Sequence, residues 1–270
     1  MKIQTLTTTG TKETEIELPL VFSTPFRKDL IHKAVIHLTT NKFQKQGRHP
    51  TAGEDVVADS NNPPTGQGRA RIARMRGGGG GRQGEAGEVA SIRGGRQAHA
   101  PTSEKVIVKK LNKKENKLAL CSAIAATSSK KIIESRGHIL EKIDSFPIIV
   151  SDDIEKVSKA RDMKKILGAL HLTPDIERLL SRKARSGKSA LRGRGIKTGR
   201  SVLFVTKDDA KLSKACGSFR GVEVCSVKNL SVLDLAPGAV PIRLTVYSKS
   251  AIEEISKIKS THLELMVKLK

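Results

Sequence analysis

The sequence predicts an α/β protein: a three-layer α/β/α domain with a mostly parallel sheet, carrying a long Arg- and Gly-rich internal loop. Three observations predict this class. Strand patterns alternate with helix patterns after Pro101, which favours a parallel sheet covered by helices. Residues 1–44 carry an apolar helix face that needs a core to cover it. Between these parts, residues 45–105 lack both the two-residue and the 3.6-residue apolar period.

The N-terminal part is expected to pack on the same domain as the rest, because its elements cannot be stable alone. A short alternating segment at 3–6 predicts a strand. Thr24 and Pro25 are residue types that begin a helix, as its N-cap and its first helical residue. The apolar face of this helix is predicted to consist of Leu30, Ile31, Ala34, Val35 and Leu38.

The C-terminal part contains most of the predicted sheet. Asn112 and Glu115 have the spacing of a capping box that opens a helix. The remaining elements, in chain order, are a buried strand over 146–150, a helix from Asp152 and Glu155 to Leu170, a helix beginning at Thr173–Pro174, a strand over 202–205, a helix over 208–216, a strand over 222–227, a strand over 242–247 and a helix over 249–258.

Composition divides the chain into four segments. They are the N-terminal part of the globular domain (1–44), the extended loop (45–105), the main α/β globular domain (106–258) with a basic loop at 181–201, and a basic C-terminal tail (259–270). Loops as long as the extended loop are uncommon in compact domains, and they are usually functional or disordered. Its composition favours a function.

The charge of the chain points to a polyanion as partner. Lys and Arg number 50 against 27 Asp and Glu, which gives a net charge of +23. Residues 66–99 hold eleven glycines and seven arginines but no lysine. Arginine binds phosphate through a planar fork, and glycine lets a backbone approach a surface closely. The candidate phosphate-binding arginines of the extended loop are Arg69, Arg71, Arg74, Arg76, Arg82, Arg93 and Arg96.

The basic loop adds eight cations and no acid, a block that would repel itself if left unpaired. Its candidate binding residues are Arg182, Lys183, Arg185, Lys188, Arg192, Arg194, Lys197 and Arg200. The chain has only seven aromatic residues, six Phe and one Tyr, which disfavours base stacking on aromatic platforms. Binding should therefore depend on phosphate contacts and RNA shape.

Several function classes are disfavoured. The longest nearly apolar run, 118–126, is far shorter than the roughly 20 residues that cross a bilayer, and residues 1–20 resemble no signal peptide. We therefore expect no membrane partner. Three cysteines without a CxxC pair and seven scattered histidines predict neither a disulfide framework nor a metal site. We expect no cofactor and a reducing, cytosolic setting.

Four motifs resemble catalytic or nucleotide-binding sites, but each has a simpler structural interpretation. Gly79-x-Gly81-x-x-Gly84 matches a dinucleotide fingerprint by letter, yet no strand precedes it and no helix follows. Gly187-Lys188-Ser189 resembles the end of a P-loop, but Arg182 stands where the first glycine belongs. Asp152–Asp153 is predicted to cap a helix and Cys121 to be a core residue. An enzyme is not predicted.

Two other functions are alternatives to RNA binding for these residues. A DNA-coating chromatin or nucleoid protein also needs net positive charge and Arg/Gly segments, and it would bind duplex DNA as well as structured RNA. A phosphate-ester enzyme built on the α/β part would need a phosphate loop or a metal constellation, and the sequence offers neither. RNA binding is favoured over both.

An ordered set of motifs over nearly the whole chain resembles large-subunit ribosomal protein four of the archaeal and eukaryotic branch. These motifs are Gly66-Gln-Gly-Arg-Ala-Arg-Ile-Ala-Arg-Met-Arg-Gly-Gly-Gly-Gly-Gly81, Arg93-Gly-Gly-Arg96, Ala100-Pro101, Ser122-Ala-Ile-Ala-Ala-Thr127, Arg136-Gly-His138, Val150-Ser-Asp-Asp153 and Leu235-Ala-Pro-Gly238. The archaeal form fits better, because the chain lacks the long C-terminal extension of eukaryotic members.

The resemblance implies a structural constituent of the large ribosomal subunit in the cytoplasm. Such a protein binds large-subunit rRNA, supports early assembly and contacts neighbouring ribosomal proteins. Its long loop lines the constriction of the exit tunnel, where it meets the nascent peptide. The tunnel-lining residues it implies are Arg71, Arg74, Met75, Arg76, Gly77, Gly78, Gly79, Gly80 and Gly81, and the flanking rRNA contacts are Arg69, Arg82, Arg93 and Arg96. Glu85 and Glu88 depart from the less acidic eukaryotic loop.

Overall fold

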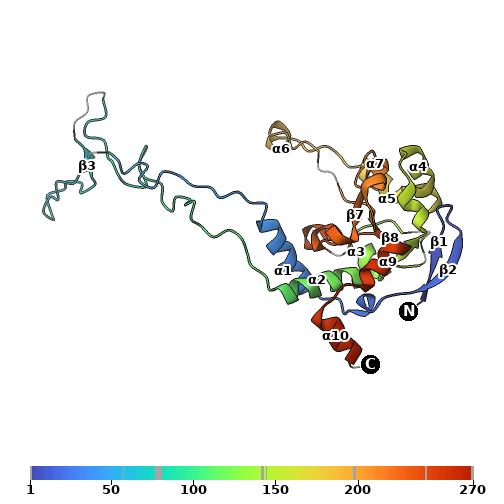
Figure 1. Cartoon of the computed structure of the whole chain (residues 1–270). Helices are drawn as coiled ribbons and strands as arrows, with labels where there is room; N and C mark the ends of the chain where they lie inside the picture. The colour runs from blue at the N-terminus through green and yellow to red at the C-terminus, as the bar shows by residue number, and fades with distance from the viewer. Residues whose placement is uncertain are drawn as a thin grey trace. The chain divides into compact units, whose positions relative to one another are not determined.

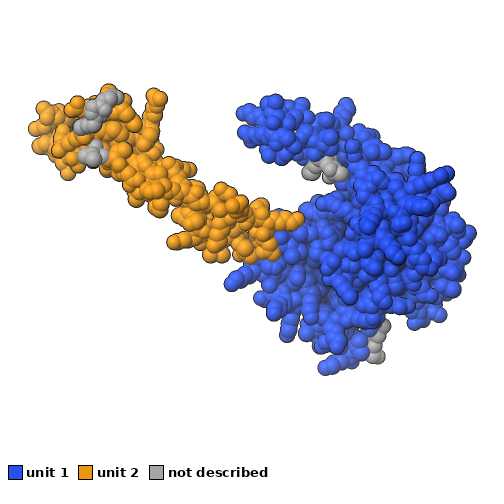
Figure 2. Space-filling view, turned by 45° about the horizontal axis from the view of Figure 1, so that its top comes forward, with its two compact units in different colours: residues 1–39, 109–270 blue, residues 40–108 orange. Residues whose placement is uncertain are grey.

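The computed structural model describes residues 2–56, 58–76, 81–140, 143, 145–196, 199–240 and 242–268 (Figure 1). The chain falls into two compact units, which Figure 2 draws in different colours. The first, here called the globular unit, comprises residues 1–39 and 109–270. The second, here called the extension, comprises residues 40–108 and is long and narrow in itself.

A six-stranded sheet forms the middle of the globular unit. Its spatial order is β2 (Lys12–Glu17), β1 (Lys2–Leu6), β5 (Ile148–Val150), β8 (Thr245–Ser248), β6 (Leu203–Thr206) and β7 (Glu223–Ser226). Neighbouring strands are parallel except β1 and β2, which pair antiparallel. The prediction of a mostly parallel sheet is confirmed.

The helical elements follow the strands in alternation. In chain order they are η1 (Leu20–Ser23), α1 (Lys28–Thr40), α2 (Lys113–Ala126), α3 (Lys130–Ser135), η2 (Asp152–Lys156), α4 (Ala160–Ala169), α5 (Thr173–Leu180), α6 (Lys188–Leu191), α7 (Ala210–Cys216), η3 (Val227–Asn229), α8 (Val232–Leu235), η4 (Pro237–Ala239), α9 (Lys249–Ser256) and α10 (Thr261–Lys268). None of the helices in the described ranges is long and apolar enough to cross a membrane.

Two hydrophobic cores lie on opposite faces of the sheet, as the period of a buried strand requires. Ile149 and Tyr247 belong to the core formed with α1, α2 and α9. Their neighbours along the strands, Ile148 and Val246, belong to the core formed with α4 and α7. Helices therefore cover both faces (Figure 1), and the predicted three-layer α/β/α fold is confirmed.

The predicted start of the first long helix at Thr24–Pro25 is wrong, because α1 begins at Lys28. Thr24 is extended and closes the 3-10 turn η1. Ser122 of α2 then holds the following backbone: its Oγ donates to the Pro25 carbonyl at 3.0 Å and accepts from the Arg27 N–H at 2.7 Å. The Pro25 carbonyl thus accepts from a side chain of α2, and the first helical bond of α1 goes to the Arg27 carbonyl, from the Ile31 N–H at 3.2 Å.

The predicted continuous helix from Asp152 to Leu170 is also wrong. The chain forms η2, an extended turn at 157–159 and then α4. Glu155 faces other elements instead of its own helix, since its Oε1 accepts from the Lys207 N–H and from the hydroxyl of Ser248. Asp152 does cap a helix, but that helix is α9, whose Ser250 N–H donates to it at 2.8 Å.

Other predicted starts have mixed outcomes. The helix predicted at Asn112 exists as α2, yet Asn112 makes no side-chain capping bond. The helix predicted at Thr173–Pro174 is confirmed as α5, and Cys121 is fully buried in the core as predicted. Strand β2 and helices α3, α6, α8 and α10 were not predicted, and α10 occupies most of the segment expected to be a basic tail.

Candidate nucleic-acid interface

The cations predicted to bind phosphate lie at the surface. The seven arginines of the extended loop are all exposed, and so are Arg182, Lys183, Arg185, Lys188, Arg192, Arg194 and Arg200 of the basic loop. Lys197 and the glycines Gly77, Gly78, Gly79 and Gly80 lie outside the described residues. Gly81 is exposed and Met75 is half-buried. A guanidinium group at the surface can present its forked donors to a phosphate.

The extension has a small fold of its own around Arg74 and Met75. These residues form β4 (Arg74–Met75), which pairs antiparallel with β3 (Ala58–Asp59). On the other side, the Met75 N–H donates to the Glu85 carbonyl at 2.8 Å, and the Gly84 N–H donates to the Met75 carbonyl at 3.0 Å. The segment that carries Arg74 and Met75, two of the candidate tunnel residues, is thus held by backbone pairing on both edges.

Two glycines of the extension let segments of its backbone approach one another closely. A Cβ on Gly87 would lie 2.7 Å from the Ala58 Cβ, and a Cβ on Gly95 would lie 1.9 Å from the Val89 carbonyl oxygen. Both distances are too short for a side chain, so these positions accept only glycine without movement of the backbone. Part of the glycine content therefore serves packing within the extension.

Three arginines of the extension pair with carboxylates of the same unit. Arg76 lies 3.4 Å from Asp59, Arg82 lies 3.1 Å from Glu85, and Arg96 lies 3.7 Å from Glu54. All six side chains are about half exposed, so water and salt weaken these pairs. Glu85 thus has a partner within the extension, and a phosphate can replace a carboxylate on each arginine at little cost.

The basic loop leaves the globular unit between α5 and β6, and α6 forms a helical turn within it (Figure 1). Gly187, the glycine of the P-loop-like motif, precedes α6 with a φ of 65°. Helix α6 spans only Lys188–Leu191 and follows no strand. The motif is therefore part of a basic turn and does not form a phosphate loop.

A buried carboxylate joins the two ends of the basic loop. Asp175 of α5 precedes the loop and is fully buried, and it accepts a hydrogen bond from the hydroxyl of Ser201, which follows the loop. It also accepts from the Nδ1–H of His138 at 3.0 Å and from the Arg178 Nε–H at 3.0 Å. Burial alone would raise the pKa of Asp175, but the bonds from His138, Ser201 and Arg178 lower it to about 2.

The hydrogen bonds of His138 define its charge state. The Leu244 backbone N–H donates to Nε2 at 3.3 Å, so Nε2 carries no proton, while Nδ1–H donates to Asp175. His138 is therefore neutral, with the proton on Nδ1. Burial lowers the pKa of His138 and is the largest influence on it, in agreement with a neutral ring.

Acid should destabilise the globular unit through His138. Below its ordinary pKa of about 6.5, the unfolded chain takes up a proton that the folded state resists. We expect the free energy of unfolding to fall by up to about 1.4 kcal/mol per pH unit as the pH drops below 6.5. Asp175 adds a further loss of stability at lower pH, towards its folded pKa of about 2. Urea unfolding followed by circular dichroism between pH 7.5 and 5 measures the first effect.

The exposed His32 supplies the matched control for this pH dependence. A His32→Gln chain should keep the pH dependence, whereas a His138→Gln chain should lose part of it. An unchanged free energy of unfolding for the original chain between pH 7.5 and 5 would contradict the neutral buried state.

Arg243 is a second buried charge at this place, with no exposed surface. Its Nε donates to the Ser201 carbonyl, and Nη2 donates to the carbonyls of Val202 at 3.0 Å and Gly221 at 2.7 Å. Nη1 donates to Glu223, which also pairs with Arg200 at the end of the basic loop. The base of the loop is thus fixed to β6 and β7 by charged groups.

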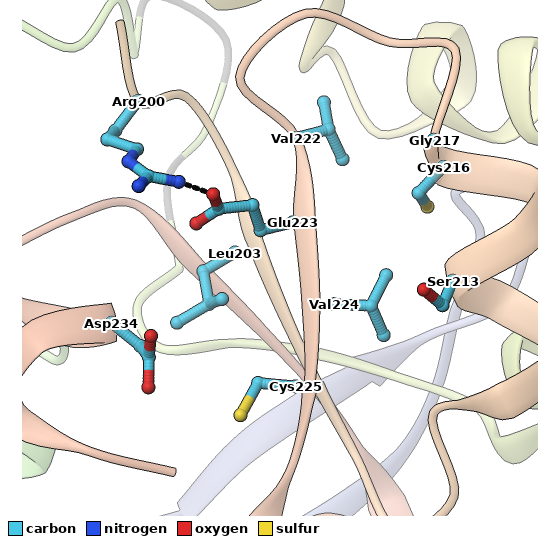
Figure 3. A pocket seen from close by; sticks show the side chains of 10 residues that line it. All are labelled: Arg200, Leu203, Ser213, Cys216, Gly217, Val222, Glu223, Val224, Cys225 and Asp234. Carbon is cyan, nitrogen blue, oxygen red and sulfur yellow. Dashed lines mark ion pairs between the residues drawn. The ribbon is translucent and has the colours of Figure 1, made fainter. Parts of the chain in front are cut away.

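A pocket of about 370 Å³ lies along β7 (Figure 3). It is lined by Arg200, Leu203, Ser213, Cys216, Gly217, Val222, Glu223, Val224, Cys225 and Asp234. Burial raises the pKa of Cys216 to about 12 and that of Cys225 to about 11, so both thiols are protonated at neutral pH and are poor nucleophiles. Arg200 points to Glu223 in this view and pairs with it.

No group of three or more His, Cys, Asp or Glu residues that could hold a metal ion occurs within the described ranges. The candidate interface therefore consists of exposed cations on the extension and on the basic loop, and a buried polar network supports the basic loop. Sequence reasoning missed Asp175, His138 and Arg243. The signal available for Arg243 was a lone cation inside the apolar run 242–247.

Comparison with known proteins gives one consistent family. The model of the ribosomal protein L4/L1 family matches residues 16–258. The large ribosomal subunit protein uL4 of Pyrobaculum aerophilum is 42% identical over 91% of this chain and 86% of its own length. Those of Sulfurisphaera tokodaii and Haloquadratum walsbyi are 42% and 39% identical, each over 92% of this chain and over 91% and 96% of their own lengths. On this evidence the chain belongs to the ribosomal protein L4/L1 family and is of the archaeal uL4 type.

Proposed function

We propose that this chain is a structural constituent of the large ribosomal subunit that binds large-subunit rRNA through the extension and the basic loop. As a member of a family of ribosomal proteins, the chain is not an enzyme, and it works in the cytoplasm. The observation that carries the rRNA proposal is the exposure of all seven predicted arginines on the extension. Family membership also favours this function over the DNA-coating alternative.

Residues 71–81 of the extension, here called the tip, are proposed to line the constriction of the peptide exit tunnel and to contact the nascent peptide. The hairpin of β3 and β4 supports this role, because it fixes Arg74 and Met75 in a defined backbone frame. Hydrogen bonds also orient two neighbouring arginines. Nη2 of Arg71 donates to the hydroxyl of Thr65, and Nη2 of Arg76 donates to Oδ1 of Asn61. A frame of this kind presents side chains at defined positions before RNA surrounds it.

The arginines of the extension are proposed to contact rRNA phosphates during assembly of the subunit. The surface ion pairs of Arg76, Arg82 and Arg96 are weak, so rRNA phosphates can exchange with their carboxylates as the extension enters the RNA. With about eight phosphate contacts, the affinity for rRNA should fall by roughly three to five decades as the salt concentration rises from low to moderate. The globular unit would then dock against rRNA and neighbouring ribosomal proteins.

Replacement of Arg71, Arg74 and Arg76 by alanine is expected to leave the globular unit folded but to impair assembly. The three cations are exposed and contribute nothing to the cores of the globular unit. The chain is expressed in cells and followed by mass spectrometry through a high-salt sucrose gradient. The original chain should remain stoichiometric with the large subunit, and the triple variant should give fewer complete subunits or altered nascent-chain passage.

A matched control removes three exposed cations of α4, Arg161, Lys164 and Lys165, by the same substitution. This control should assemble more nearly like the original chain. Release of the original chain at moderate salt, or its migration with DNA, would contradict the proposed function. Normal subunit yield and normal nascent-chain passage in the triple variant would contradict the role of the tip alone.

A further inference from the structure

Phe43 is the most exposed aromatic side chain among the described residues, at 58%. Five of the seven aromatic residues pack in or against the two cores of the globular unit: Phe22, Phe146, Phe204, Phe219 and Tyr247. Phe26 is 40% exposed. A phenyl ring in water is unfavourable, and it gains free energy from a surface that covers it. The ring of Phe43 is therefore available to a partner.

The backbone of Phe43 is fixed within the extension. Its N–H donates to the Thr40 carbonyl at 3.2 Å, in the turn that follows α1. Phe43 lies on the first of two arms of the extension, residues 41–48 and 102–108, here called the paired arms. A Cβ on Gly47 would lie 3.0 Å from the Ser103 Cβ, so the arms lie against each other at this point. A residue whose backbone is already fixed loses little conformational entropy when a ligand binds.

The charge of the paired arms indicates what kind of partner covers this ring. The arms contain a single acid, Glu104, against four exposed cations, which are Lys42, Lys45, Arg48 and Lys105. An apolar protein surface that covered Phe43 would also take neighbouring lysines out of water without supplying an anion, which is unfavourable. An RNA strand offers planar bases and phosphates together. Charge complementarity therefore favours RNA as the partner of Phe43.

We propose that Phe43 is a stacking platform for an unpaired base of RNA, and that Lys42 and Lys45 bind the phosphates beside that base. Every base has a π-face, so an aromatic ring with adjacent cations holds a single-stranded nucleotide whatever its sequence. The small number of aromatic residues disfavours platforms of several rings, but one exposed ring is sufficient for one base. The inference rests on the proposed rRNA binding and adds an uncharged contact to it.

The salt dependence of binding separates the stacked base from the phosphate contacts. The full chain is titrated against an in vitro transcript of large-subunit rRNA over a range of KCl concentrations. Phe43→Ala should weaken binding by roughly 5- to 150-fold, the loss of one stacked base. The slope of log K against log salt should not change, because the lost contact carries no charge. Phe43→Tyr keeps the ring and should bind as the original chain does, whereas Lys45→Gln should reduce the slope by about 0.7 to 0.9.

Fluorescence gives a second measurement at the same position. The chain has no tryptophan, so Phe43→Trp introduces a single indole at an exposed site. A base stacked on this indole should quench its emission when the transcript is added. Leu265 on α10 is also 58% exposed and supplies the matched control. Leu265→Ala should bind the transcript as the original chain does, and the emission of Leu265→Trp should not be quenched.

Three outcomes would contradict the inference or the proposal beneath it. Unchanged affinity of Phe43→Ala, or an equal loss with Leu265→Ala, would overturn the stacking platform while rRNA binding stands. If the emission of Phe43→Trp ignored the transcript and moved to shorter wavelength only in assembled subunits, a protein would cover this position and the platform would be overturned. Failure of the original chain to bind the transcript would instead overturn the proposed function.

Discussion

Replacement of Asp175 by alanine is expected to lower the free energy of unfolding of the globular unit by about 3 to 5 kcal/mol, the cost of breaking a buried charged pair from one side. The carboxylate accepts from four groups: His138, Ser201, Arg178 and the backbone N–H of Ile139. All four would lose this acceptor at once. Urea unfolding at pH 7.5, followed by circular dichroism at 222 nm, measures the change.

Asp153 provides the control for Asp175. It is exposed and pairs only at the surface with Lys156. The Asp153→Ala chain should unfold within about 0.5 kcal/mol of the original chain. A loss below about 1 kcal/mol for Asp175→Ala would show that the network at the base of the basic loop does not stabilise the unit.

Replacement of Arg243 by alanine is expected to have an effect of similar size, again about 3 to 5 kcal/mol. Its fully buried guanidinium donates to three carbonyls and to Glu223, and the substitution also leaves a cavity between β6, β7 and β8. Arg243→Lys should restore little of this stability, because an ammonium group cannot reach the same acceptors with a planar fork. The same urea titration measures both variants.

The exposed Arg161 on α4 again serves as the control, since Arg161→Ala removes an equal charge from the surface. This variant should unfold within about 0.5 kcal/mol of the original chain. If the Arg243→Lys chain had the same free energy of unfolding as the original chain, a positive charge alone would be sufficient at this position. The planar guanidinium would then not be required.

The sequence was most informative where burial alone determines structure. The apolar segments of β5, β6 and β8 predict buried strands, because each strand contacts a core on both faces. Strand β2 was missed because its residues, Lys-Glu-Thr-Glu-Ile-Glu, lie at the edge and are mostly exposed. Antiparallel pairing with β1 makes this segment a strand, and its polar composition does not indicate one.

Helix starts predicted from local sequence were wrong where the polar groups concerned form hydrogen bonds with a distant element. Thr24 and Pro25 look like a helix start, but Ser122, distant in sequence, holds the backbone there. Asp152 caps a helix that begins about a hundred residues later. For the candidate interface, composition alone identified the exposed cations. The buried Asp175 network could not be predicted, since its members are brought together only by the fold.

The pairing of β1 with β5 has a consequence for synthesis of the chain. Leu6 lies opposite Val150, and the Ser151 N–H donates to the Leu6 carbonyl at 2.9 Å. The extension lies between these partners in the sequence, so the first strand cannot join its parallel neighbour until the whole extension has been translated. Pairings this distant slow folding. The arginines of the extension are therefore synthesised before the sheet can close, and they are available to a polyanion while the globular unit is still incomplete.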